Sequence, residues 1–199
     1  MLYRTLILLA ISGWPAPLIA NESIPKVPIV SSRSCPLECC SYGAKWIAHG
    51  RLVAYESPKE ATKMFGIEID EVVVAETGFV VTRKLGETKV LQTTKLGAPN
   101  NIATPFSEPL VALEPNDILY ILRPQGEKCD KFWYEGRFYA AEIAPGAKGK
   151  AFAAGNPMLK ILSRPEITWW VKVRNGQGQT GWVKDPYELI SSAKCEKNA

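Results

Sequence analysis

Short apolar runs separated by turn residues make up most of the chain from about residue 45 onward. They are rich in β-branched and aromatic residues, which favour strands over helices. Many short runs of this kind at close spacing are typical of a β-sandwich or a β-barrel. The pattern therefore predicts an all-β protein, with strands in runs such as KWIA, EVVVA, FVVTRKL, ILYIL, RFYAAEI and WWVKVR.

The run WWVKVRNGQGQTGWV, residues 169–183, predicts a β-hairpin. Asn175 and Gly176 both tolerate the positive φ that a two-residue hairpin turn requires. A turn there pairs Arg174 with Gln177, and a four-residue loop from Asn175 to Gly178 leaves the same side chains on the same faces. In both registers one face carries Trp169, Val171, Val173, Thr180 and Trp182, and the other carries Trp170, Lys172, Arg174, Gln179 and Val183.

The two faces of this hairpin predict different roles. The face with Trp169 and Trp182 is apolar, so we expect it to be core. The face with Trp170, Lys172 and Arg174 combines an aromatic ring with two bases, and such a group can stack on a sugar ring or a peptide group. These three residues are candidate ligand-binding residues, and a solvated strand with no ligand is the alternative.

A second aromatic hairpin is predicted in KFWYEGRFY. A turn at Glu135-Gly136 pairs Trp133 with Phe138, and it places Phe132, Tyr134 and Tyr139 together on the other face. Because a tyrosine hydroxyl can stay in water, we expect the tyrosine face to be the wetter one. Tyr134 and Tyr139 are therefore candidates for an aromatic groove, and a core strand is the alternative.

The chain contains a faint internal repeat. Residues 67–74 and 113–120 share one pattern: an apolar residue, two spacer residues, two polar turn residues and three apolar residues. A turn leading into a strand would produce this pattern. A proline-containing connection lies between them. We expect an extended tether at 21–34, one module at 35–105 and a second at 106–199.

The second half resembles a known group of domains. The combination of WVKVR, a Gly-rich turn and TGWV is similar to the closing hairpin of bacterial SH3-like domains, and the segment Leu113–Tyr120 resembles their opening strand. With ILYIL and KFWYEG, the pattern looks like that of exported proteobacterial proteins containing SH3-like domains, for which no activity is established. The resemblance implies two small SH3-like barrels, the first matching more loosely because TGFVVT stands where a Gly-Trp-Val strand is expected.

The first 20 residues, MLYRTLILLAISGWPAPLIA, have the layout of a secretory signal peptide: one early base, a short apolar core and a small residue at Ala20. The apolar run is too short to span a membrane, so no membrane span is expected after cleavage. We therefore expect a periplasmic or secreted protein.

Five cysteines lie beyond this segment, where oxidation is permitted. Sequence alone leaves their pairing open. We expect two disulfides and one thiol, with Cys129 paired to Cys195, and Cys35 paired to Cys39 or Cys40. The pattern fits no ordinary zinc site, so no metal is expected.

Composition and motifs leave few catalytic possibilities. Without Arg4 the chain has 23 bases and 20 acids, a charge of +3, and no basic arm suited to nucleic acid. The grouping of Cys39, Cys40 and His49 could suggest a cysteine hydrolase, but the strand count leaves no room for that fold. No cofactor motif is found.

We therefore expect a non-catalytic binding module of the cell envelope, with peptidoglycan or an envelope protein as its ligand. The alternatives are a divergent cell-wall hydrolase and a structural or inhibitory partner of another exported protein.

Overall fold

The computed structural model describes residues 23–37, 40–59, 62–97, 110–125, 129–141, 143 and 157–191. Its regular elements are strands, β1 to β15, and the described residues contain no helix. The prediction of an all-β protein is confirmed. The expected signal peptide, residues 1–20, lies outside the described residues.

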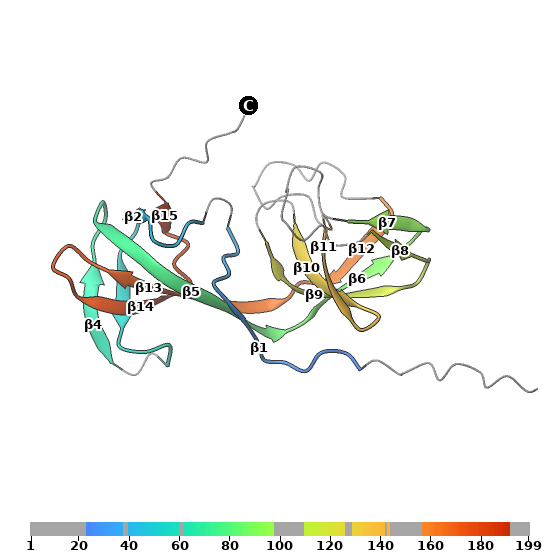
Figure 1. Cartoon of the computed structure of the whole chain (residues 1–199), viewed down its shortest axis with the longest axis horizontal. Helices are drawn as coiled ribbons and strands as arrows, with labels where there is room; N and C mark the ends of the chain where they lie inside the picture. Colours follow the sequence, from blue (N-terminus) through green and yellow to red (C-terminus); the bar gives the residue numbers. More distant parts are fainter. Residues whose placement is uncertain are drawn as a thin grey trace, which may run out of the picture.

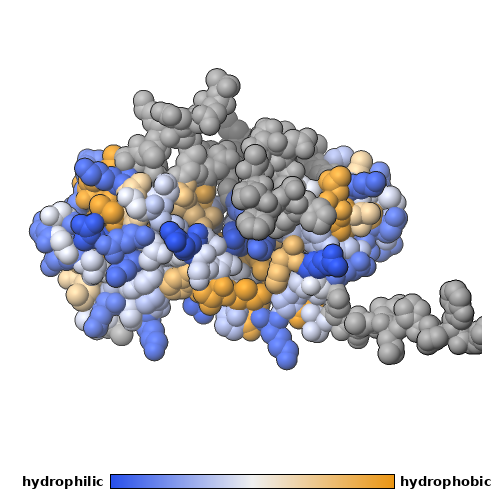
Figure 2. All heavy atoms as spheres, in the orientation of Figure 1, coloured by the Kyte–Doolittle hydropathy of each residue, from blue (hydrophilic) through white to orange (hydrophobic). Residues whose placement is uncertain are grey.

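The first sheet has eight strands from both ends of the described chain. Its hydrogen-bonded order is β15-β2-β5-β13-β14-β3-β4, and β1 pairs with β5 beside this path. In Figure 1 these strands form the left part of the molecule, and β1 runs along its lower middle. Figure 2 shows an apolar area in the same lower-middle region, and Val30 of β1 is exposed. The bounds are β1 Ile29–Ser32, β2 Lys45–Ala48, β3 Leu52–Tyr55, β4 Lys63–Ile67, β5 Val72–Lys84, β13 Glu166–Arg174, β14 Thr180–Lys184 and β15 Leu189–Ser191.

The second sheet has five strands in the order β11-β10-β9-β6-β12, on the right in Figure 1. β7 and β8 pair only with each other among the described residues. Neither sheet is closed into a barrel within the described part of the chain, in contrast to the two closed barrels that the resemblance implied. The bounds are β6 Gly86–Val90, β7 Thr94–Leu96, β8 Val111–Leu113, β9 Ile118–Pro124, β10 Asp130–Tyr134, β11 Arg137–Ala141 and β12 Leu159–Ser163.

The second sheet is nested within the first along the chain. β5 leads directly into β6, and β12 leads back into β13, which pairs with β5 along most of its length. The closing hairpin β13–β14 therefore pairs with strands of residues 52–84, and not with the segment Leu113–Tyr120. Hydrogen-bonded pairing thus does not follow a division of the chain between residues 105 and 106.

The internal repeat corresponds to one turn built twice. Asp70 and Asn116 occupy the same turn position, and both have positive φ, 66° and 80°. The backbone N–H of Asp70 donates to the carbonyl of Ala48 at 2.8 Å, and that of Asn116 donates to Val90 at 2.9 Å. An acid closes each turn, because Glu71 accepts from the N–H of Glu68 and Asp117 accepts from that of Glu114. Each turn therefore fixes the start of a long strand, β5 or β9, against the end of β2 or β6.

The similarity extends to the order of both sheets. Five consecutive strands of the first sheet, β15-β2-β5-β13-β14, correspond to β12-β6-β9-β10-β11 in the second. The register agrees as well: Leu189 pairs with Ala48 at the end of β2, and Leu159 pairs with Val90 at the end of β6. Both central pairs also carry an irregularity at the same place, after Lys172 in β13 and after Lys131 in β10. The two sheets are two copies of one arrangement.

Each sheet has its own hydrophobic core. The first is built around Trp46, Trp169, Ile67 and the valines of β5, β13 and β14. The second is built around Phe132, Leu113 and Leu119. Where the sheets meet, the buried hydroxyl of Thr82 donates to the carbonyl of Leu122 at 3.0 Å, so β5 and β9 are joined by a satisfied polar contact.

Candidate functional site

The β13–β14 hairpin has a five-residue loop, Asn175 to Gln179, because Arg174 pairs with Thr180. Asn175 builds this loop: its Oδ1 accepts from the backbone N–H groups of Gln177 and Gln179, and its Nδ2 donates to Gln179 Oε1 at 2.8 Å. Gly178, with φ of 80°, supplies the positive φ. The predicted two- or four-residue loop is therefore wrong.

An odd loop length reverses the faces of β14. Trp182 now pairs with Lys172, and Val183 pairs with Val171. Val183 is buried in the first core, while Trp182 is half-buried on the opposite face. The prediction that Trp182 shares the core face with Trp169 is wrong, whereas Trp169, at 0% exposed, does lie in the core.

Trp170 is buried, at 2% exposed, and is not the exposed ring that the pattern predicted. Tyr55 of β3 packs edge-on against it, with ring centroids 6.4 Å apart, and Phe79 of β5 pairs with it across the strands. Phe79 in turn packs edge-on against Trp182, with ring centroids 5.4 Å apart. These four side chains form an aromatic face on the first sheet, comprising Tyr55, Phe79, Trp170 and Trp182.

The basic residues beside the aromatic face share one acid. Glu76 of β5 accepts from Arg174 Nε at 3.0 Å, and its second oxygen lies 3.7 Å from Lys172 Nζ. Two cations and one carboxylate leave a local charge of +1. Exposed ion pairs of this kind contribute little to stability, so the cluster mainly orients the two cations beside the aromatic face.

The second hairpin has the register that the sequence predicted. Trp133 pairs with Phe138, Phe132 pairs with Tyr139, and the turn residues Glu135 and Gly136 both have positive φ. The expectation that its tyrosine face is the wetter one is wrong. Phe132 is fully buried, and the tyrosines of its face pack against the second core.

Both candidate tyrosines have structural partners. Tyr134 donates its hydroxyl to Asp117 Oδ2 at 2.6 Å, and Tyr139 stacks on Phe132 with centroids 5.5 Å apart. Burial, followed by the hydrogen bond to Asp117, raises the pKa of Tyr134 above its ordinary value. The opposite face holds Phe138, which is 46% exposed, with the Lys131 ammonium 5.6 Å from its ring centroid.

The structure therefore does not bring the predicted ligand residues together. Trp170, Lys172 and Arg174 lie in the first sheet, whereas Tyr134 and Tyr139 lie in the second. Sequence reasoning missed Tyr55, Glu76 and Phe79, because they come from strands far away in the sequence. Only the pairing of β5 with β13 and of β3 with β14 places them beside the hairpin.

One disulfide is present among the described residues, between Cys35 and Cys40. This is the second of the two partners expected for Cys35, and it removes the Cys40 thiol from any nucleophilic role. Cys129 is buried, while Cys39 and Cys195 lie outside the described residues. The described residues hold no cluster of acids, histidines or cysteines arranged to bind a metal. They also include no helix long and apolar enough to cross a membrane.

Comparison with known proteins gives no identification: no family model, no curated protein and no solved structure matches the chain.

Proposed function

We propose that the protein is an exported, non-catalytic binding protein of the cell envelope, whose ligand is peptidoglycan or an envelope protein. It is built from two SH3-like modules, the second nested within the first. The common strand order of the two sheets and the repeated turn support the idea of two related modules. The Trp-Val and Gly-Trp-Val strands that carry the resemblance pair with each other as β13 and β14.

The observation that carries the binding function is the aromatic face of the first sheet. Trp182 and Phe79 are half-buried, so each ring keeps part of its surface in solvent while its neighbours hold it in place. Such preorganised aromatic surfaces bind sugar rings and peptide groups at low entropic cost. The Glu76–Arg174 pair at the same face adds polar groups that can orient a ligand.

The disulfide supports export. Disulfides persist in oxidising compartments such as the periplasm and are rare in the cytosol. Cys35–Cys40 closely follows β1, which pairs with β5 within the segment expected to be a tether. The predicted signal peptide agrees with this location.

Co-sedimentation with purified cell wall tests the proposal. We expect the wild-type protein to sediment with the wall and Trp182→Ala to remain mostly in the supernatant. Phe138→Ala is the matched control, because it removes an exposed aromatic side chain from the other sheet. Retention of Trp182→Ala on the wall at the wild-type level would refute the aromatic face as the binding site.

The same assay separates the alternatives. Release of soluble muropeptides would indicate a divergent wall hydrolase instead of a binding protein. Absence of any wall binding, together with capture of one exported protein, would indicate a structural or inhibitory partner.

A further inference from the structure

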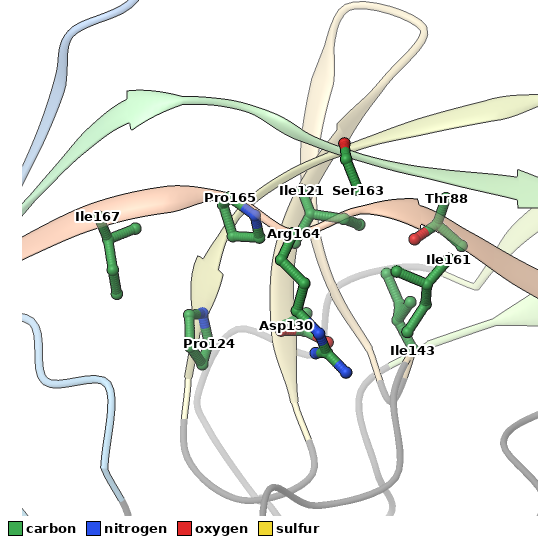
Figure 3. Close-up of a pocket in the computed structure, with 10 residues that line it drawn as sticks. All are labelled: Thr88, Ile121, Pro124, Asp130, Ile143, Ile161, Ser163, Arg164, Pro165 and Ile167. Carbon is green, nitrogen blue, oxygen red and sulfur yellow. The ribbon is translucent and has the colours of Figure 1, made fainter.

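The two sides of the second sheet carry different side chains. A cavity of about 110 Å³ lies on the inner side, and Figure 3 shows Thr88 of β6 and Ile161 of β12 among the side chains that line it. These two residues pair with each other, and Thr88 also pairs with Leu119 of the second core. Because strand side chains alternate, Lys89 and Lys160, their neighbours in the sequence, lie on the opposite side, the outer face of the second sheet.

A row of aromatic residues crosses this outer face. Glu87, Tyr120, Trp133 and Phe138 pair in turn across β6, β9, β10 and β11. The rings of Tyr120 and Trp133 have centroids 5.9 Å apart, and Phe138 is 46% exposed. The ammonium of Lys131 lies over the Phe138 ring, 5.6 Å from its centroid. The row is therefore open to solvent at its β11 end, beside a cation.

Two lysines lie opposite each other on the same face. Lys89 pairs directly with Lys160, and like charges in such a pair destabilise a sheet. Neither lysine forms an ion pair with Glu87 or with any other described residue. Lys89, Lys131 and Lys160 against the one acid Glu87 give the accessible groups of this face a charge of +2. An anionic partner would relieve the repulsion between the two lysines.

The first sheet carries an apolar pair at the place of these lysines. Trp46 pairs with Val73 as Thr88 pairs with Leu119, so Trp46 fills in the first sheet the place that Thr88 has beside the cavity. The next residue of β2, Ile47, corresponds to Lys89, and it pairs with Ile190. An isoleucine pair in one sheet is thus a lysine pair in the other, although the backbone arrangement is the same.

The acid that neutralises the first sheet is also missing from the second. Glu76 is the extra residue at the irregularity of β5, where it contacts Lys172 and Arg174. Leu122 is the extra residue at the equivalent irregularity of β9. Lys131, which corresponds to Lys172, therefore has no carboxylate at that place.

We propose that the outer face of the second sheet binds the surface of an anionic lipid membrane. β6 and β10 are two strands apart, so Lys89 and Lys131 are separated by about 10 Å across the sheet, and a single small anion cannot contact both. A bilayer presents phosphate groups over the whole face. Aromatic side chains settle at the level of the lipid headgroups, and lysines are attracted to anionic lipids.

This membrane site is independent of the proposed wall-binding site. The outer face belongs to the second sheet, whereas the aromatic face with Trp182 belongs to the first. The two sites can therefore be tested separately in one protein.

Sedimentation of the mature protein with lipid vesicles tests the proposal. We expect binding to vesicles of equal parts phosphatidylcholine and phosphatidylglycerol, weaker binding to phosphatidylcholine alone, and loss of binding as salt is raised. The double variant Lys89→Gln and Lys160→Gln should weaken binding about thirtyfold, or about fivefold for each lysine. Its melting temperature should not fall, because the variant removes two opposed charges.

A matched double variant removes the same charge elsewhere. Lys59 and Lys63 are exposed in the first half of the chain, and Lys59→Gln with Lys63→Gln should leave vesicle binding unchanged. Equal binding by the two double variants would overturn the proposal. Binding of soluble polyglutamate without binding of anionic vesicles would also overturn it, and would indicate an acidic polymer as the partner.

Single aromatic variants separate this site from the wall-binding site. Phe138→Ala should weaken vesicle binding about fivefold, because it removes an exposed ring that enters the headgroup layer. Trp182→Ala should leave vesicle binding unchanged, whatever its effect on sedimentation with cell wall. If Trp182→Ala and not Phe138→Ala weakens vesicle binding, the membrane contacts the first sheet and the assignment to the second is wrong.

Discussion

Trp182 lies directly opposite Lys172 in the β13–β14 pair, on the face away from the first core. Trp169 of the same hairpin is fully buried, and its ring centroid lies 6.0 Å from that of Trp46. Its indole N–H donates to the Tyr42 hydroxyl at 3.1 Å. Trp169 and Trp182, two of the three tryptophans of this hairpin, therefore have different roles.

Alanine substitutions at these tryptophans should differ in cost. Trp169→Ala removes a core ring and a hydrogen bond, so we expect a loss of about 3–5 kcal/mol in the free energy of unfolding. Trp182→Ala removes a half-buried ring and should cost about 1 kcal/mol. Urea unfolding measures both, and an equal cost would show that the ring of Trp182 is part of the core.

Asn175 determines the five-residue loop, so its removal should destabilise the hairpin. Asn175 is buried and bonds to two backbone N–H groups, which Asn175→Ala would leave without a partner at a cost of about 2 kcal/mol. Gln177→Ala, at an exposed position of the same loop, should change stability by less than about 0.5 kcal/mol. If thermal or urea unfolding shows the two variants to be equally stable, Asn175 does not determine the loop.

The repeated turn allows a comparison within one chain. Glu71→Ala removes one acceptor from the first turn, whereas Asp117→Ala removes the acceptor of both Glu114 N–H and the Tyr134 hydroxyl. We therefore expect Asp117→Ala to cost about 1 kcal/mol more than Glu71→Ala in urea unfolding. The reverse order would mean that the Tyr134 contact does not stabilise the fold.

Tyr134 should make stability depend on alkaline pH. Burial and Asp117 raise its pKa in the folded state above the ordinary value of 10.0. The fold therefore favours the neutral phenol, so this contribution is fully present below pH about 10 and is lost as pH rises further through the raised pKa. In a titration of phenolate absorbance, Tyr134→Phe should remove a component on the alkaline side of ordinary tyrosine. Loss of a component in the ordinary range would contradict this.

The Cys35–Cys40 disulfide closes a short loop, and the entropy model gives about 2 kcal/mol for a loop of this size. The double variant Cys35→Ser and Cys40→Ser should lose this amount relative to the oxidised protein. Denatured, unreduced wild type should titrate with one thiol, as expected if Cys129 pairs with Cys195. A count of three thiols would leave Cys35–Cys40 as the single disulfide of the chain.

The local sequence pattern was sufficient to predict strand register where only one turn conformation fits the residues. Gly136 accepts positive φ without a steric cost, and aromatic runs lie on both sides of Glu135-Gly136, so the β10–β11 register could be predicted from the sequence. The repeat at 67–74 and 113–120 likewise predicted two equivalent turns, because each pairs a residue that tolerates positive φ with an acid that closes the turn.

Interactions between side chains and between strands decided the length of the β13–β14 loop, the faces of β14 and the burial of Trp170. Asn175-Gly176 also fits a shorter turn, and the Asn175 side-chain bonds that select a five-residue loop exist only in the folded hairpin. That one extra residue turned every side chain of β14 to the other face, because strand side chains alternate. Trp170 is buried because β3 and β5 bring Tyr55 and Phe79 over it, and no pattern within β13 contains them.

The apolar runs by themselves determined that the chain forms strands, since β-branched and aromatic side chains pack well on a pleated surface. They could not determine which strands pair, because a strand edge offers the same N–H and C=O groups to any neighbour. Only the tertiary structure set β13 beside β5 and nested the second sheet within the first. The same arrangement left Thr88 at a cavity where Trp46 fills the equivalent space in the other sheet.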